Sequence, residues 1–268
     1  YWKESGTIKN QMLQRASIRS NLNFQPASAV RISSRMNYVV LQNTFAQTGF
    51  GDNGESLGRG NRGATGGWAQ ANQRALPIIP VLDSAGSYFD PLRGRNIAAG
   101  NDPANFNSGQ QQYRFLGSLS VEYTPFAALS VKGEAGADFV NARNYYWVSD
   151  VIRYNRYASE TNSAIRNLTG TAYATWKPNL TQGHRLTTVA GAEWQQSTHR
   201  RQTYAFEGLV GSQQEIGEIA SGEQMLVAVG GIFPDQGFVS FFMRNHYDFE
   251  KKYFLSASIR RDGSSVFA

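Results

Sequence analysis

Residues 129–139 read LSVKGEAGADF, and this stretch decides the fold. One series of alternate positions holds apolar side chains and a glycine: Leu129, Val131, Gly133, Ala135, Ala137 and Phe139. The series between them holds polar and charged side chains: Ser130, Lys132, Glu134 and Asp138. A period of two places the two series on opposite faces of a sheet. The stretch therefore predicts a strand with one apolar face and one charged face.

The same alternation recurs in about eight segments of roughly 11 residues, which is the strand length that a barrel wall needs to cross a membrane. We expect strands at residues 14–24, 30–45, 113–123, 129–141, 166–176, 185–195, 237–247 and 253–261. Short turns alternate with long connections at about 46–112, 142–165 and 197–236. In an outer-membrane barrel the short turns are periplasmic and the long loops are extracellular. The pattern predicts an all-β, transmembrane, antiparallel β-barrel.

The composition allows this fold without proving it. Hydrophobic residues make up 41% of the 268-residue chain, and no apolar run approaches the roughly 20 residues of a membrane helix. A barrel strand shows only half of its side chains to lipid, so its average polarity is moderate. The chain has no cysteine, which excludes disulfides and thiolate metal sites. A soluble β-sandwich also alternates and stays open as an alternative, although loops this long are unusual in one.

The net charge of +6 raises the question of nucleic-acid binding. The arginines do not cluster on one helix or loop. They occupy polar positions along several predicted strands: Arg15, Arg19, Arg31, Arg35, Arg185, Arg244 and Arg260. This distribution is typical of the wet face of a wall, so we expect no nucleic-acid partner.

Short motifs give no sign of catalysis. Residues 49–54 read GFGDNG and match a dinucleotide-binding spelling, but that site needs a strand before it and a helix after it. The three histidines, His184, His199 and His246, have no metal-ligand spacing. We therefore expect no enzyme activity, no catalytic residues, no metal site and no cofactor.

Three sequence motifs resemble the SusC/RagA family of TonB-linked outer-membrane transporters. Residues 237–249 read GFVSFFMRNHYDF and residues 252–267 read KYFLSASIRRDGSSVF, which together resemble a barrel hairpin of that family. Residues 80–88, PVLDSAGSY, resemble a family loop, although Asp90 stands where the family usually has asparagine. Residues 15–23, RASIRSNLN, are similar to a family strand. The resemblance runs in order along essentially the whole chain.

The resemblance implies a fold, a function and partners. Such transporters have a barrel of about 22 strands around a plug, so residues 1–268 are expected to be a partial barrel domain from a longer protein. The implied location is the outer membrane, in contact with its lipid. The implied activity is active import of a large nutrient, a glycan or an oligopeptide. The implied partners are a SusD-like lipoprotein and TonB, which would bind an N-terminal segment outside this chain.

Aromatic side chains in the predicted long loops are the candidate substrate-binding residues. They are Trp68, Tyr88, Phe89, Tyr145, Tyr146 and Trp147. Flat rings with a polar edge are suited to stacking on sugars or peptides, but the same residues would also serve to pack loops together or against a partner lid. Two other functions stay open: a passive porin-type channel, and a soluble carbohydrate-binding or adhesin module.

Overall fold

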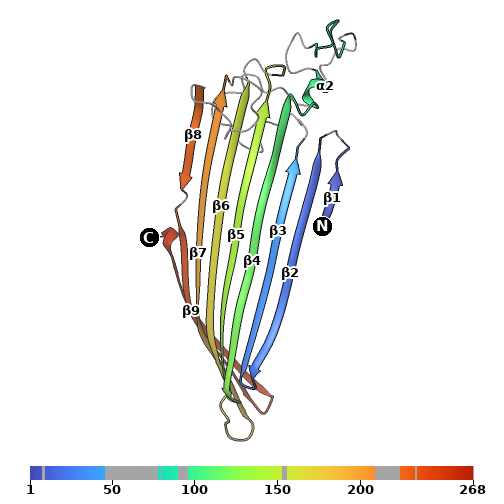
Figure 1. Ribbon diagram of the computed structural model, residues 1–268. Coiled ribbons are helices and arrows are strands. Elements are labelled where there is room, and N and C mark those ends of the chain that lie inside the picture. Colours follow the sequence, from blue (N-terminus) through green and yellow to red (C-terminus); the bar gives the residue numbers. More distant parts are fainter. Residues whose placement is uncertain are drawn as a thin grey trace.

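The computed structural model shows a single antiparallel sheet whose strands follow one another in space as they do in sequence (Figure 1). It describes residues 1–7, 10–45, 78, 80–89, 96–152, 156–208, 224–232 and 234–267. The strands are β1 (Trp2–Ser5), β2 (Met12–Ala27), β3 (Val30–Thr44), β4 (Phe106–Phe126), β5 (Leu129–Val148), β6 (Tyr157–Trp176), β7 (His184–Glu207), β8 (Gln224–Ile232), β9 (Gln236–Phe249) and β10 (Tyr253–Ser264). Two short helical segments, α2 (Ile97–Gly100) and η3 (Ser265–Phe267), complete the described secondary structure. The predicted all-β, antiparallel class is confirmed.

Along one edge, strand β7 pairs with two different strands in succession. Its lower half, from His184 to Ser197, pairs with β9, and its upper half, from Arg200, pairs with β8. Strands β8 and β9 therefore form one interrupted wall strand. The wall has the eight predicted strands, together with the short strand β1, which pairs with the start of β2 and which the sequence pattern did not predict.

Most of the strands are longer than predicted, and this corrects the boundaries of the long loops. Residues 106–112, 142–148, 157–165 and 197–207, which the sequence pattern placed in loops, belong to β4, β5, β6 and β7. The ladder of backbone hydrogen bonds continues there without a break in register between β4 and β6. The alternation of apolar and polar residues fades in these segments because their two faces no longer meet lipid on one side and water on the other. Backbone pairing continues because it does not depend on that difference in polarity.

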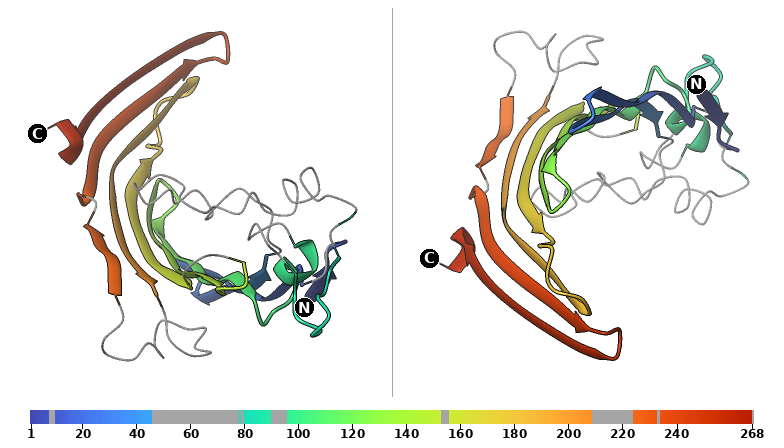
Figure 2. Two further views of the ribbon diagram at one scale, coloured as in Figure 1. Left: turned by 90° about the horizontal axis from the view of Figure 1, so that it is seen from above. Right: turned by 90° about the horizontal axis from the view of Figure 1, so that it is seen from below.

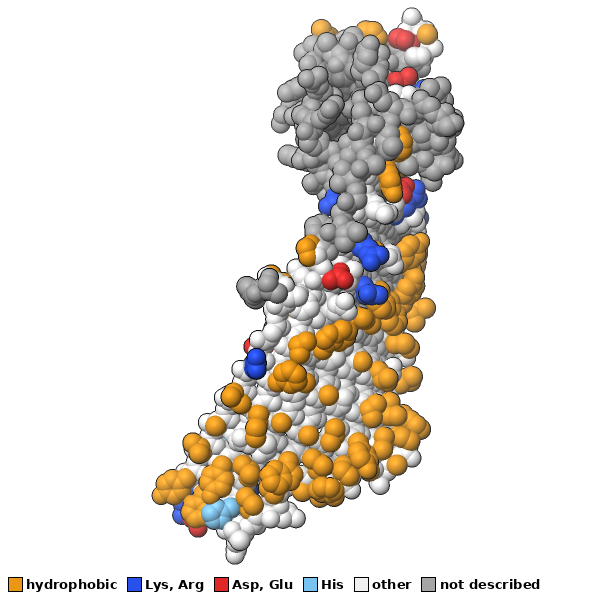
Figure 3. Space-filling view, turned by 90° about the vertical axis from the view of Figure 1, so that its left-hand side faces the viewer, with side chains coloured by type: hydrophobic (Ala, Val, Ile, Leu, Met, Phe, Trp, Pro, Cys, Tyr) orange, Lys and Arg blue, Asp and Glu red, His pale blue; other side chains and the backbone are white. Residues whose placement is uncertain are grey.

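The sheet curves into an arc that is open on one side, with β1 and β2 at one end and β10 at the other (Figure 2). Cross-strand pairing places every predicted apolar series on one common face; for example, Ile18, Tyr38, Phe115 and Phe139 share one row. A space-filling view of the convex side shows these hydrophobic side chains as a broad belt (Figure 3). The predicted two-sided wall is present.

The apolar side chains of the convex face are bare. Large side chains of the belt are between 40% and 74% exposed: Ile18, Leu22, Phe24, Met36, Tyr38, Leu119, Val121, Tyr123, Val131, Trp176, Trp194, Val239, Phe241, Met243, Leu255, Tyr253 and Ile259. No second layer of described protein packs on the belt, as it would in a sandwich. Exposed apolar area on this scale marks a surface that meets lipid or another protein. No described helix is long and apolar enough to cross a membrane.

The concave face carries the charged series, and its members pair across strands. Arg114 makes two hydrogen bonds to the carboxylate of Asp138, at 2.9 and 2.8 Å. Arg260 contacts Glu193 at 2.7 Å and Asp262 at 2.8 Å, and Asp262 also accepts a hydrogen bond from Ser240. These ion pairs satisfy part of the charge on a face that stays wet.

The two faces make opposite predictions for a charged substitution in the middle of β4. We expect Leu119→Arg, on the convex face, to destabilise the intact bilayer-inserted protein by about 2–4 kcal/mol, because it moves a charge into hydrocarbon. Ser120→Arg, one residue further along and on the concave face, is the matched control and should cost less than about 1 kcal/mol. Urea-induced unfolding from lipid vesicles measures both. Equal destabilisation by the two substitutions would contradict this assignment of faces.

Candidate functional site

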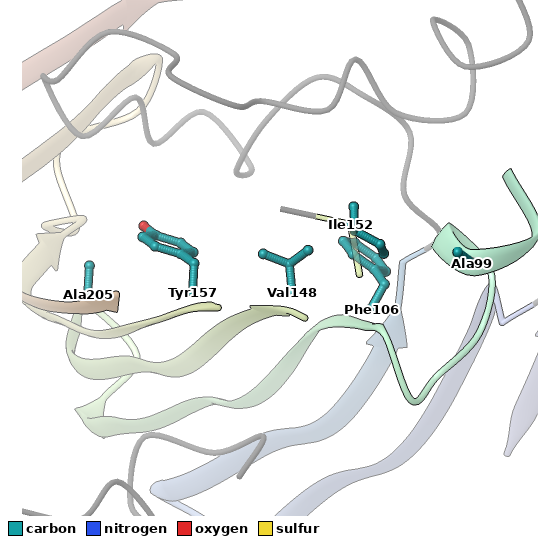
Figure 4. Packing of buried hydrophobic residues seen from close by; sticks show 6 residues of the cluster. All are labelled: Ala99, Phe106, Val148, Ile152, Tyr157 and Ala205. Atoms are coloured by element: carbon teal, nitrogen blue, oxygen red, sulfur yellow. The ribbon is translucent and has the colours of Figure 1, made fainter. Parts of the chain in front are cut away.

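The end of the concave face that lies far from the short turns holds an apolar cluster rather than charged side chains. This inner cluster consists of Ala99, Phe106, Val148, Ile152, Tyr157 and Ala205, each no more than 8% exposed (Figure 4). Tyr146 packs against it and contacts two of its rings edge-on, with centroids 5.5 Å from Phe106 and 5.9 Å from Tyr157. The cluster joins the ends of β4 to β7 to α2 and to the segment after β5.

Residues 80–89 form a small hairpin at this end. The carboxylate of Asp83 accepts hydrogen bonds from the backbone N–H groups of Ala85 and Ser87, both at 2.9 Å. Gly86 has a φ of 81°, a left-handed conformation that favours glycine. The aspartate and glycine of the PVLDSAGSY motif therefore build the turn itself.

Tyr88 docks this hairpin on the wall. Its hydroxyl donates a 2.8 Å hydrogen bond to Oδ2 of Asp102, and its ring packs against the inner cluster. The bond to Asp102 raises the pKa of Tyr88 above its ordinary value of 10.0, with burial and the negative charge of Asp102 adding to the effect. Because the folded pKa is the higher one, the protonated donor stabilises the docked hairpin throughout neutral pH, and this stabilisation is lost only as the pH rises through the raised pKa.

Two asparagines connect the surrounding segments. The amide of Asn96 donates to the carbonyl oxygens of Val81, at 2.7 Å, and Phe89, at 3.1 Å, which ties the segment before α2 to the hairpin. Asn105, just before β4, accepts a 3.0 Å hydrogen bond from the buried hydroxyl of Ser149, just after β5. The hairpin, α2 and the strand ends thus form one connected unit.

The six predicted substrate-binding aromatics do not lie together. Trp68 lies outside the described residues. Tyr88 and Phe89 are in the hairpin, where Phe89 is 37% exposed. Tyr145, Tyr146 and Trp147 were expected in a loop but belong to β5, so their side chains alternate between the two faces. Tyr146 faces the concave side with the inner cluster, whereas Tyr145 and Trp147 face the convex side.

The convex side of this same end has its own small cluster. Trp147, 3% exposed, packs with Ala158 and Phe206. The guanidinium carbon of Arg143 lies 5.7 Å from the ring centroid of Tyr145. Tyr145 lies over Gly109 so closely that a Cβ on Gly109 would collide with its hydroxyl. These side chains cover the sheet where the lipid belt has ended.

Sequence reasoning missed the residues that organise this end. Phe106, Val148, Ile152 and Tyr157 were not among the predicted candidate residues. The sequence did contain a usable signal. Tyr146 and Val148 lie at alternate positions and continue the period of two of β5 beyond Asn141. The site offers packed aromatic and amide groups, and the described residues contain no group of three or more His, Asp or Glu side chains placed to hold a metal ion.

Comparison with known proteins identifies relatives of one kind. The sequence is 25% identical over 279 aligned residues to the TonB-dependent receptor P26 of Formosa agariphila, and the match covers 100% of this chain and 26% of that protein. No family model matches the sequence. The chain thus spans about a quarter of the length of this curated relative.

Solved structures show the same fold. A chain of the RagAB peptide transporter superposes with a TM-score of 0.66 at 17% identity, covering 95% of this chain and 28% of that one. The siderophore receptor PiuA from Acinetobacter baumannii matches with a TM-score of 0.50 at 12% identity, over 98% of this chain and 37% of the receptor. The predicted resemblance is confirmed: the chain is similar to TonB-dependent receptors of the outer membrane and has the fold of a segment of their barrel wall.

Proposed function

We propose that this wall belongs to an active importer of a large nutrient, a glycan or an oligopeptide. The observation that carries the proposal is the two-faced wall, apolar and bare on its convex side and charged on its concave side, in a fold shared with a peptide transporter. A wall of this kind separates lipid from a wet lumen wide enough for a bulky solute once further strands close it. The soluble module is disfavoured by the bare apolar belt.

The proposed partners rest on the resemblance to the SusC/RagA family. A SusD-like lipoprotein would cap the extracellular end, and TonB would supply energy through a segment outside this chain. The RagAB transporter, which shares the fold, is a peptide importer. The connected unit of hairpin, α2 and strand ends stands at the end where a cap would sit.

The lumen face would be positively charged. Arg15, Arg19, Arg35 and Arg244 lie on the concave face and have no ion-pair partner among the described residues. We propose that these side chains contact water and a plug inside the closed barrel, as the wet face of the wall requires.

Substrate contact is proposed for the predicted aromatics: Trp68, Tyr88, Phe89, Tyr145, Tyr146 and Trp147. Support is strongest for Phe89, because it is exposed on a hairpin that Tyr88 and Asn96 hold in place. Tyr145 and Trp147 face away from the lumen, and Trp147 is buried against Ala158 and Phe206, so support for contact with a solute in transit is weakest for these two residues.

The energy requirement tests the function. Cells that express the intact protein are expected to take up fluorescent oligopeptides or oligosaccharides, and uptake should stop when TonB is removed or a protonophore collapses the proton gradient. Uptake that persists at an unchanged rate under both treatments would identify a passive porin-type channel instead.

The contact role of Phe89 is tested by Phe89→Ala in the intact protein. A stacked ring contributes about 0.5–1.5 kcal/mol, so we expect ligand affinity, measured by calorimetry with a transported oligopeptide or oligosaccharide, to fall about three- to tenfold. Phe241→Ala, which removes an exposed ring from the lipid-facing belt, is the matched control and should leave the affinity unchanged. An unaltered ligand affinity in Phe89→Ala would show that this side chain does not contact the substrate.

The docking role of Tyr88 is tested by Tyr88→Phe, which deletes one hydroxyl. The lost hydrogen bond to Asp102 should loosen the hairpin by about 1 kcal/mol, so the amide hydrogens of Ser87 and Phe89 should exchange about fivefold faster in mass spectrometry. Tyr123→Phe serves as the control, because Tyr123 lies near the end of β4 that is far from the hairpin. Unchanged exchange in Tyr88→Phe would show that ring packing alone holds the hairpin.

A further inference from the structure

Two arginines of neighbouring strands lie on the lipid-facing side of the wall. Arg166 of β6 pairs in register with Phe139 on one side and Thr198 of β7 on the other, and Phe139 stacks on Phe115 in the apolar series. Arg200 is two residues beyond Thr198, so its side chain shares this face. Both arginines are exposed. The other arginines discussed above as wall residues face the lumen.

The position of Arg166 along the strand matches the outer edge of the membrane. Arg166 lies ten positions before Trp176, which is at the periplasmic end of β6, and ten steps give a rise of about 23 Å for a strand tilted near 45°. The apolar band of an outer-membrane barrel is about 25 Å tall. Lys and Arg side chains border the upper edge of the hydrophobic belt in the space-filling view (Figure 3). Arg200 lies one step further toward the outside.

The charges of Arg166 and Arg200 are not neutralised within the described part of the chain, where neither has an ion-pair partner. Further toward the outside on the same face, Arg143, which is level with Asn162, binds Glu160 at 2.7 Å, so a carboxylate does pair with another arginine of this face. The hydroxyl of Thr198, 7% exposed and between the two arginines in the row, also has no hydrogen-bond partner among the described residues. Within the described ranges, the two guanidinium groups and the buried Thr198 hydroxyl thus lack an acceptor.

We propose that Arg166 and Arg200 bind the phosphate of a phosphorylated glycolipid headgroup in the outer leaflet. A guanidinium group matches the geometry of a phosphate through two parallel N–H bonds. Diagonal neighbours on paired strands are about 7–8 Å apart, so both forks reach one headgroup. The arginine stems lie along the apolar surface with their charged ends in the headgroup layer, and the half-buried ring of Phe139 beside them meets the first part of the acyl chains.

The headgroup itself provides the first test. Delipidated intact protein in a neutral detergent is titrated with lipid A bisphosphate, with enzymatically dephosphorylated lipid A and with inorganic phosphate, and binding is followed by native mass spectrometry. We expect lipid A bisphosphate to bind at least about tenfold more tightly than the dephosphorylated lipid, since charged hydrogen bonds carry the recognition. Equal binding of the two lipids would overturn the proposal, and equal occupancy by inorganic phosphate would reduce the site to a free-anion site.

Variants assign the binding to the two side chains. Arg166→Gln combined with Arg200→Gln should weaken lipid A bisphosphate binding about tenfold or more and remove its dependence on ionic strength. Arg35→Gln combined with Arg244→Gln changes the charge equally on the lumen face and should leave binding unaltered. An equal loss in both double variants would show a general charge effect and contradict the site. The comparison of phosphorylated with dephosphorylated lipid A uses the unaltered protein, so it tests the proposed phosphate site even if a variant fails to fold.

Discussion

Backbone hydrogen bonding inside hydrocarbon is the constraint on which this structure depends. No water is available there to satisfy N–H and C=O groups, so each strand that crosses must pair along its full length with its neighbours. Strands β5 and β6 pair in one continuous register from Leu129 to Val148, and β4 pairs with β5 in one register from Phe106 to Tyr123, with a shift only beside the turn. The wall is therefore one layer thick, and side-chain packing is not what holds it together. The side chains instead adapt the two faces to lipid and to water.

The role of the side chains changes where the lipid belt ends. Below that level, the convex face is bare and the concave face is charged. Above it, the same ladders carry apolar side chains on both faces: Trp147, Ala158 and Phe206 on one, and the inner cluster on the other. Water now surrounds both sides, so burial of apolar area contributes stability there as it does in a soluble protein. The hairpin anchored by Tyr88 becomes possible only on this packed platform.

This change of role explains what the sequence could and could not predict. The strand that begins at Leu129 was placed correctly at its start, because lipid and lumen impose opposite polarities on alternate residues. Its continuation to Val148 was missed, because Tyr145, Tyr146 and Trp147 are aromatic at both parities. The hairpin at 80–88 was recognised through resemblance, but its partner Asp102 is 14 residues from Tyr88 in a segment without periodicity. Pairings of that kind depend on tertiary contacts.

The interruption between β8 and β9 shows how the two levels of the wall stay independent. Along β7 the same parity faces outward throughout, yet Arg200 pairs with Ile232 and Gln196 pairs with Gly237, so the partner strand changes parity between these positions. One extra residue has been accommodated, next to Pro234, which has no N–H to give to a ladder. The extra residue separates the two registers, so β9 keeps its alternation within the belt independently of the sequence of β8. Thr198, opposite the interruption, and Arg200 just above it therefore lie where the demands of lipid end and those of the extracellular surface begin.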